Sequence, residues 1–188
     1  MKNDEIILML NKIVTQKSNE LGFEIMKPKH SGNVISILRE EWHLFLEMHS
    51  PIVSSLLLQM TIYVEDKAVR MLFFPSPAII DNRNMNQFIL LSNVANRYLY
   101  IGSALGRFWV DVENRDFAYE LILREELIEH HASEIEKQLF DVPYSHFKDL
   151  HIPLLMLEEN VWKADMAIRY LTELREKGYV DNSVYGLW

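Results

Sequence analysis

The 188-residue chain contains no cysteine, only six glycines and only six prolines. Without cysteine it can form no disulfide, bind no metal through a thiolate and use no cysteine nucleophile. No stretch is rich in glycine, proline or serine, as a linker would be, and no segment repeats at the period of a solenoid. We therefore expect a single domain over residues 1–188.

Long apolar runs and basic clusters are missing as well. No stretch reaches the roughly 18 to 20 apolar residues that a membrane span requires. The chain begins MKNDEIILMLNKIV, where acidic residues precede a short, interrupted apolar stretch, unlike a secretory signal. The 19 Lys and Arg are outnumbered by 27 Asp and Glu, giving a net charge of −8, and no basic run with interleaved aromatics would attract a phosphate backbone. We expect a soluble, cytoplasmic protein that binds neither membranes nor nucleic acids.

The usual catalytic motifs are also lacking. The chain has no GxGxxG, GxxxxGK, GxSxG or HExxH pattern. Gly102 and Gly106 follow a predicted helix and precede a predicted strand, the reverse of the order in a phosphate-binding loop, so we assign them to a turn. The residues therefore predict no catalytic group and no cofactor, and the chain is not expected to be an enzyme.

Hydrophobic periodicity predicts an α+β fold, an antiparallel sheet of about five strands with helices packed on it. Apolar residues at helical spacing predict a helix over 4–21 ended by Gly22, and a second helix after the capping residues 81–84. Alternation of apolar and polar residues predicts the strands, with short polar turns making two hairpins. The strands are residues 42–48, 56–64, 69–73, 108–112 and 117–123. The predicted order is α-β-β-β-α-β-β-α-α.

From Glu125 onward the pattern is helical. A break is expected around Asp141 to Pro143, because proline is poorly tolerated inside a helix. A final long helix is predicted to begin near Pro153 and to end at Gly178. Its apolar stripe has heptad-like spacing and consists of Leu154, Leu157, Val161, Ala164, Ile168 and Leu171. Residues 34–38 fit a strand or a helix equally well.

One group of ionisable residues could hold a metal. If residues 126–134 are helical, Glu126, His130 and Glu134 share a face, and imidazole with carboxylates suits a divalent cation. Acidic helices with a few histidines are more often solvated surfaces, which is the interpretation we favour. The alternative hypothesis is a metal-dependent enzyme that uses these residues, or a grouping with His146 and His151.

Aromatic residues are the strongest functional signal. Trp109 is out of phase with Phe108 and Val110, so it faces the other side of its strand, where a terminal helix covers it or it anchors a partner or second copy. Trp162 lies off the stripe of the predicted last helix and widens its apolar face. The tail 179–188 is apolar and either packs back on the domain or covers a sheet edge, in this molecule or in a partner. The predicted partner-binding residues are Trp109, Trp162, Tyr185 and Trp188.

Residues 93–123, NVANRYLYIGSALGRFWVDVENRDFAYELIL, resemble the YbjN family of bacterial proteins. The similarity is a helix containing asparagines, a small apolar turn, a strand of the type GRFWVD, a short acidic turn and a returning strand. It is carried by Asn93, Asn96, Arg97, Phe108, Val110 and Asp111. The resemblance extends over residues 1–150, and residues 153–188 look like an additional helix and tail.

The resemblance implies an α+β domain similar to the type III secretion chaperones. Such proteins are often small, acidic, dimeric and without catalytic residues, and YbjN is described as a regulator of sensory transduction. The chain is therefore expected to be a non-enzymatic protein-binding or regulatory module, a homodimer without cofactors, that engages another protein through exposed apolar surface.

Overall fold

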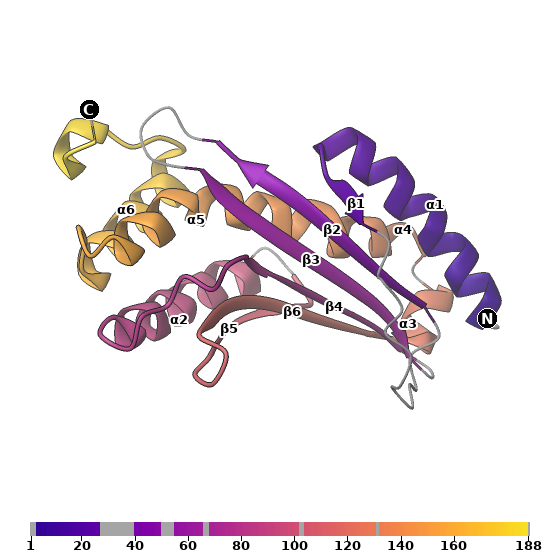
Figure 1. Cartoon of the computed structure of the whole chain (residues 1–188). Coiled ribbons are helices and arrows are strands. Elements are labelled where there is room, and N and C mark those ends of the chain that lie inside the picture. Colours follow the sequence, from indigo (N-terminus) through magenta and orange to yellow (C-terminus); the bar gives the residue numbers. More distant parts are fainter. Residues whose placement is uncertain are drawn as a thin grey trace.

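The computed structural model describes residues 3–26, 40–49, 55–65, 68–101, 104–130 and 132–187, but not the side chains of Asn3, Tyr100, Ile101, Glu129, His130, Ala132 and Ser133. It is an α+β fold built on a six-stranded antiparallel sheet with the order β1-β2-β3-β4-β6-β5 (Figure 1). The strands are β1 (Glu24–Met26), β2 (Glu40–Met48), β3 (Leu56–Glu65), β4 (Ala68–Pro75), β5 (Arg107–Asp111) and β6 (Asp116–Arg124). The helices are α1 (Asn3–Leu21), α2 (Met85–Ile101), α3 (Glu125–His130), α4 (Ala132–Glu136), the π-helical η1 (Lys137–Asp141), α5 (Val142–Glu158), α6 (Ala164–Lys177) and the 3₁₀ turn η2 (Asn182–Tyr185).

The predicted fold class is confirmed, and each of the five predicted strands is present. The sixth strand is β1, a three-residue segment that pairs with β2 through Ile25 and Leu44. Both predicted hairpins form, β3 with β4 and β5 with β6. The segment 34–38 lies outside the described residues.

One face of the sheet forms the core. Every second residue of β2, β3, β4 and β6 is buried, as the alternation predicts. Helices α1, α2 and α5 bury their apolar stripes against this covered face, and α5 passes behind the strands in Figure 1. Phe73 of β4 shows the packing: its ring centre lies 4.6 Å from that of Phe147 on α5 and 5.9 Å from that of Phe23. Burial of such rings is the main stabilising contribution to a domain of this size.

The expected break at Asp141 to Pro143 is wrong. Asp141 and Val142 both have helical backbone angles, and η1 continues directly into α5. Pro143 lies in the first turn of α5, directly after the π-helical turn, where the Val142 N–H donates five residues back to the Lys137 carbonyl. Lys17 of α1 reinforces this junction, because its Nζ lies 2.9 Å from the Asp141 carboxylate and 3.0 Å from that of Glu136. These contacts raise the pKa of Lys17.

The predicted long helix from Pro153 to Gly178 is also wrong. Pro153 lies inside α5, and the helix is interrupted instead between Glu158, where α5 ends, and Ala164, where α6 begins. Asn160 ends α5 with a left-handed backbone (φ 56°), which asparagine adopts more readily than other non-glycine residues. Gly178 does end α6, with φ 77°. The apparent stripe is therefore split between two helices, and the boundary drawn at residues 150–153 falls within α5.

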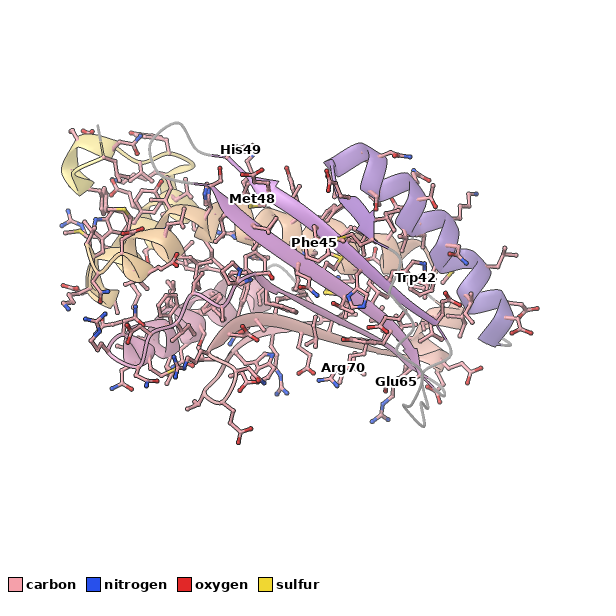
Figure 2. The ribbon with its side chains drawn as sticks, in the orientation of Figure 1. Trp42, Phe45, Met48, His49, Glu65 and Arg70 are labelled. Atoms are coloured by element: carbon pink, nitrogen blue, oxygen red, sulfur yellow. The ribbon has the colours of Figure 1, made fainter. Side chains whose placement is uncertain are left out.

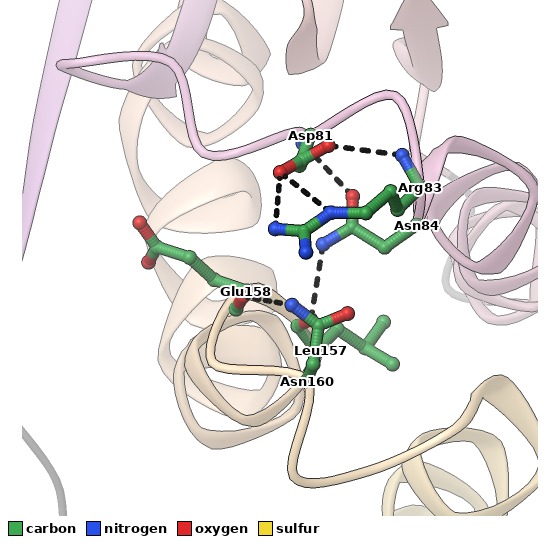
Figure 3. Close-up of polar contacts among 6 residues, drawn as sticks. All are labelled: Asp81, Arg83, Asn84, Leu157, Glu158 and Asn160. Carbon is green, nitrogen blue, oxygen red and sulfur yellow. Dashed lines mark hydrogen bonds and ion pairs between the residues drawn. The ribbon is translucent and has the colours of Figure 1, made fainter.

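The break after α5 is tied to the start of α2 (Figure 3). Asn84 donates from Nδ2 to the Leu157 carbonyl at 3.2 Å, while its Oδ1 accepts from the Asp81 backbone N–H at 2.8 Å. Asp81 in turn pairs with Arg83 at 2.8 Å. Asn84, which the sequence predicts as a helix cap, thus also holds the C-terminal end of α5 against the start of α2.

Candidate functional site

The second face of the sheet is not covered by any described helix, and we call it the open face. Its residues alternate with the core positions of each strand, and none of their apolar side chains joins the core cluster. The open face consists of Glu24 and Met26 on β1, Glu41, His43, Phe45 and Glu47 on β2, Leu57, Gln59, Thr61, Tyr63 and Glu65 on β3, Ala68, Arg70, Leu72 and Phe74 on β4, Asp116, Ala118, Glu120, Ile122 and Arg124 on β6, and Arg107, Trp109 and Asp111 on β5.

Three partly exposed aromatic side chains lie in a row across the open face. Phe45 and Phe74 flank Gln59, with which both are paired in register. Ala118 follows on β6, next in line after Phe74, and pairs with Trp109 on β5. Figure 2 labels Phe45 on this side of the sheet, with Arg70 and Glu65 nearer one end of the strands. The aromatic row is therefore Phe45, Phe74 and Trp109, and it crosses the strands from β2 to β5.

Trp109 is on the side of β5 opposite to Phe108, as the sequence predicts. It is partly exposed, whereas Phe108 is buried in the core. Its indole Nε1 is buried and has no hydrogen-bond acceptor within the described part of the chain. An unsatisfied buried donor costs about 1–3 kcal/mol, and the described part of the chain has the same condition at Ser18, Tyr119 and Arg175.

A polar network lies beside the aromatic row on β2 and β3. His43 Nε2 is 2.7 Å from Glu41, and its Nδ1 is 3.3 Å from the Thr61 hydroxyl. This order of carboxylate, imidazole and hydroxyl resembles that of a hydrolytic triad. Thr61 is only 1% exposed, however, and the backbone around it is engaged in the sheet, which leaves no amide pair aimed at an oxyanion. We interpret the network as a cross-strand contact that satisfies buried polar atoms.

A second network lies on β4, β6 and β5. Glu120 is buried and accepts hydrogen bonds from Arg70 Nε and Nη2, the latter at 2.7 Å. Arg107 approaches the other oxygen at 3.4 Å. The carboxylate is thereby compensated by two guanidinium groups, which anchor both arginines to the sheet.

The edge strand β5 is tied to α2 by one side chain. Asn96 accepts from the Phe108 backbone N–H at 2.6 Å and donates to the Phe108 carbonyl at 2.8 Å. Both hydrogen bonds are to backbone groups that point away from β6. This contact fixes the position of β5, and with it the position of Trp109.

Trp162 and Tyr185 are not at a surface, which corrects the assignment of both to partner binding. Trp162 is in the loop between α5 and α6 and is 5% exposed, and Tyr185 is 3% exposed. The indole of Trp162 donates to the Tyr185 carbonyl at 3.2 Å, and the Tyr185 hydroxyl donates to Glu173 at 2.7 Å. Tyr170 packs against both rings. The described part of the tail therefore packs back on its own domain, because these rings bury each other; Trp188 lies outside the described residues.

A cluster of ionisable residues, of which His146 is buried and Asp149 and Arg175 are half-buried, joins α5 and α6. Arg175 approaches His146 Nδ1 at 2.6 Å and Asp149 at 2.6 Å, and its guanidinium lies over the ring of Tyr98 on α2. Burial and the nearby guanidinium lower the pKa of His146 to about 4, so the ring is neutral and accepts at neutral pH. Burial raises the pKa of Asp149. These contacts tie α6 to α5, although the Arg175 Nε is buried without a hydrogen-bond partner among the described residues.

The metal-site alternative gains no structural support. Glu126 and Glu134 are exposed, and the side chain of His130 lies outside the described set. His146 is engaged by Arg175, and His151 is buried. Among the described side chains, no group of three or more His, Asp or Glu residues could hold a metal ion.

Comparisons with protein-family models, with curated proteins and with solved structures found no match to this chain. Within the described ranges, no helix is both long enough and apolar enough to cross a membrane. The open face is the surface of the described chain that carries partly exposed aromatic residues in a row, and the sequence pattern does not predict Phe45 and Phe74 as part of it. Like Trp109, both are aromatic residues out of phase with the core positions of their strands, which is the signal that could have identified them.

Proposed function

We propose that the chain is a non-enzymatic protein-binding or regulatory module, of the kind its resemblance to the YbjN family implies, and that the open face is its docking surface. The observation that carries the proposal is the aromatic row. Partly exposed aromatic side chains concentrate at protein interfaces, where they supply large contact area at low entropic cost. Phe45, Phe74 and Trp109 are partly exposed, and none of them belongs to the hydrophobic core of the described chain.

The test is affinity capture of the tagged full chain from a lysate of its own host, compared with two variants. Phe74→Ser removes the centre of the aromatic row. Leu90→Ser is the matched control, because Leu90 is 50% exposed on α2 and lies outside the row. We expect a reproducible partner with wild type and Leu90→Ser, and its loss with Phe74→Ser. If no recovered protein depends on Phe74, the open face is not the docking surface.

The expected homodimer belongs to the same proposal. Light scattering coupled to size exclusion gives the mass directly, with 22.2 kDa as the value for one chain. We expect about twice that mass, and we expect Phe74→Ser to keep it. A dimer would then form through a surface other than the aromatic row, which leaves the row free for a different protein.

A further inference from the structure

The spacing of the aromatic row restricts what can bind to it. Neighbouring strands are about 4.8 Å apart, so Phe45 and Phe74, two strands apart, are separated by about 10 Å, as are Phe74 and Trp109. Between them lie Gln59 and the small Ala118. Two turns of an α-helix advance about 10.5 Å. A helix lying across the strands can therefore place apolar side chains at intervals of seven residues in register with the row.

An extended segment fits less well. Its side chains on one face recur about every 7 Å, which does not match a spacing of about 10 Å. The covered face of the same sheet already packs against helices of this chain. An amphipathic helix in which the apolar pattern i, i+3, i+4 and i+7 is repeated twice places the side chains at i, i+7 and i+14 near the three aromatic rings.

The charges beside the row indicate the charge of the partner. On the side toward Leu57, the flank carries Glu47 on β2, Asp116 on β6 and Asp111 on β5, without a lysine or arginine among the described residues of these strands at that level. Asp111 accepts hydrogen bonds from the backbone of its own turn and keeps its negative charge. Burial and the Asp111 charge raise the pKa of Asp116, as expected for a carboxylate beside a like charge. We call these three residues the acidic flank.

A second copy is a poor occupant by the same argument. It would bring its own acidic flank, and each chain carries a net charge of −8. The opposite side of the row has Arg70 and Arg107 around the single carboxylate of Glu120, and this one excess positive charge does not offset the three carboxylates of an acidic flank. Charge complementarity thus favours a cationic partner.

We propose that the open face binds an amphipathic helix of a partner protein, which lies across the strands with its apolar stripe on Phe45, Phe74 and Trp109 and its Lys and Arg residues toward the acidic flank. This inference rests on the proposed function, because it names the chemistry of the partner for the same surface. The buried Nε1 of Trp109, which has no acceptor among the described residues, lies at one end of the same row.

The probe is a labelled synthetic peptide of 18 residues made of Leu, Lys, Gln and Ala, with Leu at i, i+3, i+4 and i+7 and Lys along one flank. Binding to the full chain is measured by fluorescence anisotropy at low and at moderate salt. A peptide of the same composition in scrambled order and a peptide with Glu in place of Lys are the controls. We expect binding at least about tenfold tighter for the amphipathic basic peptide than for either control, weakening with salt.

Matched protein variants locate the binding. Phe74→Ser is expected to weaken binding at least about tenfold, and Leu90→Ser less than about twofold. Glu47→Lys should weaken it several-fold at low salt, whereas Glu176→Lys, an exposed reversal on α6, should not. Equal binding of the ordered and scrambled peptides, or unchanged binding to Phe74→Ser, overturns the inference.

The outcomes separate this inference from the proposed function. If lysate capture depends on Phe74 but the peptide shows no preference, the docking surface stands and the basic helix is wrong. If light scattering gives a dimer that Phe74→Ser dissociates, a second copy occupies the row and the inference is likewise overturned. Support requires both the peptide preference and its dependence on Phe74 and Glu47.

Discussion

The covered face and the open face of the sheet are formed by alternating residues of the same strands, and the two faces have different surroundings. Phe73 and Phe74 are neighbours on β4, yet Phe73 is fully buried between α5 and the segment after α1, while Phe74 remains partly exposed on the open face. The covered face is apolar throughout, whereas the open face combines aromatic side chains with two polar networks. The difference shows that aromatic content alone does not distinguish a core from a docking surface. The distinction comes from which side of its strand each aromatic residue faces.

The largest expected effect is on the covered face. Phe73→Ala removes a ring with closely packed aromatic neighbours, and the transfer and cavity contributions together should lower the free energy of unfolding by about 3–5 kcal/mol. Chemical denaturation followed by circular dichroism measures it. A loss below about 1 kcal/mol would mean that this face is not the core.

Burial on the covered side also predicts a pH dependence. The ring of His146 lies edge-on to Phe108, and its pKa of about 4 is below the ordinary value of 6.5, so between these values the unfolded chain binds a proton that the folded chain does not. Stability is therefore complete above about pH 6.5 and is lost as the pH falls toward 4.

The expected size of this loss is roughly 2–3 kcal/mol between pH 7 and pH 4.5. His146→Gln keeps an acceptor for Arg175 but takes up no proton, so its unfolding free energy should fall less over the same range. The raised pKa of Asp149 increases the unfolding free energy as the pH falls, which is opposite to the effect of His146. Because Asp149 is present in both proteins, its contribution cancels when their pH profiles are compared. Parallel pH profiles for the two proteins would contradict the burial of this histidine.

A smaller effect is expected where the covered side meets the sheet edge. Asn96→Ala removes both hydrogen bonds to the Phe108 backbone and should lower the unfolding free energy by about 1–2 kcal/mol. Hydrogen exchange at the Phe108 amide should accelerate as β5 loosens. Asn93→Ala is the matched control on the same helix, because Asn93 is exposed, and it should leave exchange at Phe108 unchanged.

The smallest effect on stability belongs to the open face. Phe74→Ser should change the unfolding free energy by no more than about 1 kcal/mol, because the ring is partly exposed and lies outside the core cluster. Thermal melts alongside Phe73→Ala give the comparison on two consecutive residues. A destabilisation as large as that of Phe73→Ala would show that the open face is buried by something else, and would remove the argument for docking.

The elements of the sheet could be predicted because each strand buries one side only. That alternation marks β2, β3, β4, β5 and β6 in the sequence, but it does not say which hairpins lie side by side, so the pairing of β4 with β6 could not be derived. β1 was too short to show a period. Gly106 was assigned to a turn, whereas the structure shows a further reason for the glycine: a Cβ there would collide with the ring of Tyr119.

The C-terminal region and the site were predicted less well for a physical reason. The sequence predicts a helix break at Pro143 and a helix start at Pro153, but a first turn and a well-packed helix tolerate these prolines. The helix ends instead near Asn160, which has a left-handed backbone. Trp162 and Tyr185 are predicted to bind a partner because hydrophobic periodicity cannot show that a loop and a tail pack against each other. Trp109 was placed on the correct side of its strand, because alternation reports that directly.

The side-chain amide of Asn96 has the same donor and acceptor as a peptide group, so at Phe108 helix α2 substitutes for a seventh strand. A foreign chain that tried to extend the sheet beyond β5 would have to displace a contact already made within the molecule. Such an internal mimic protects the edge against templated polymerisation, the hazard of unpaired strands. It also directs recognition away from strand addition at this edge and toward the flat of the sheet.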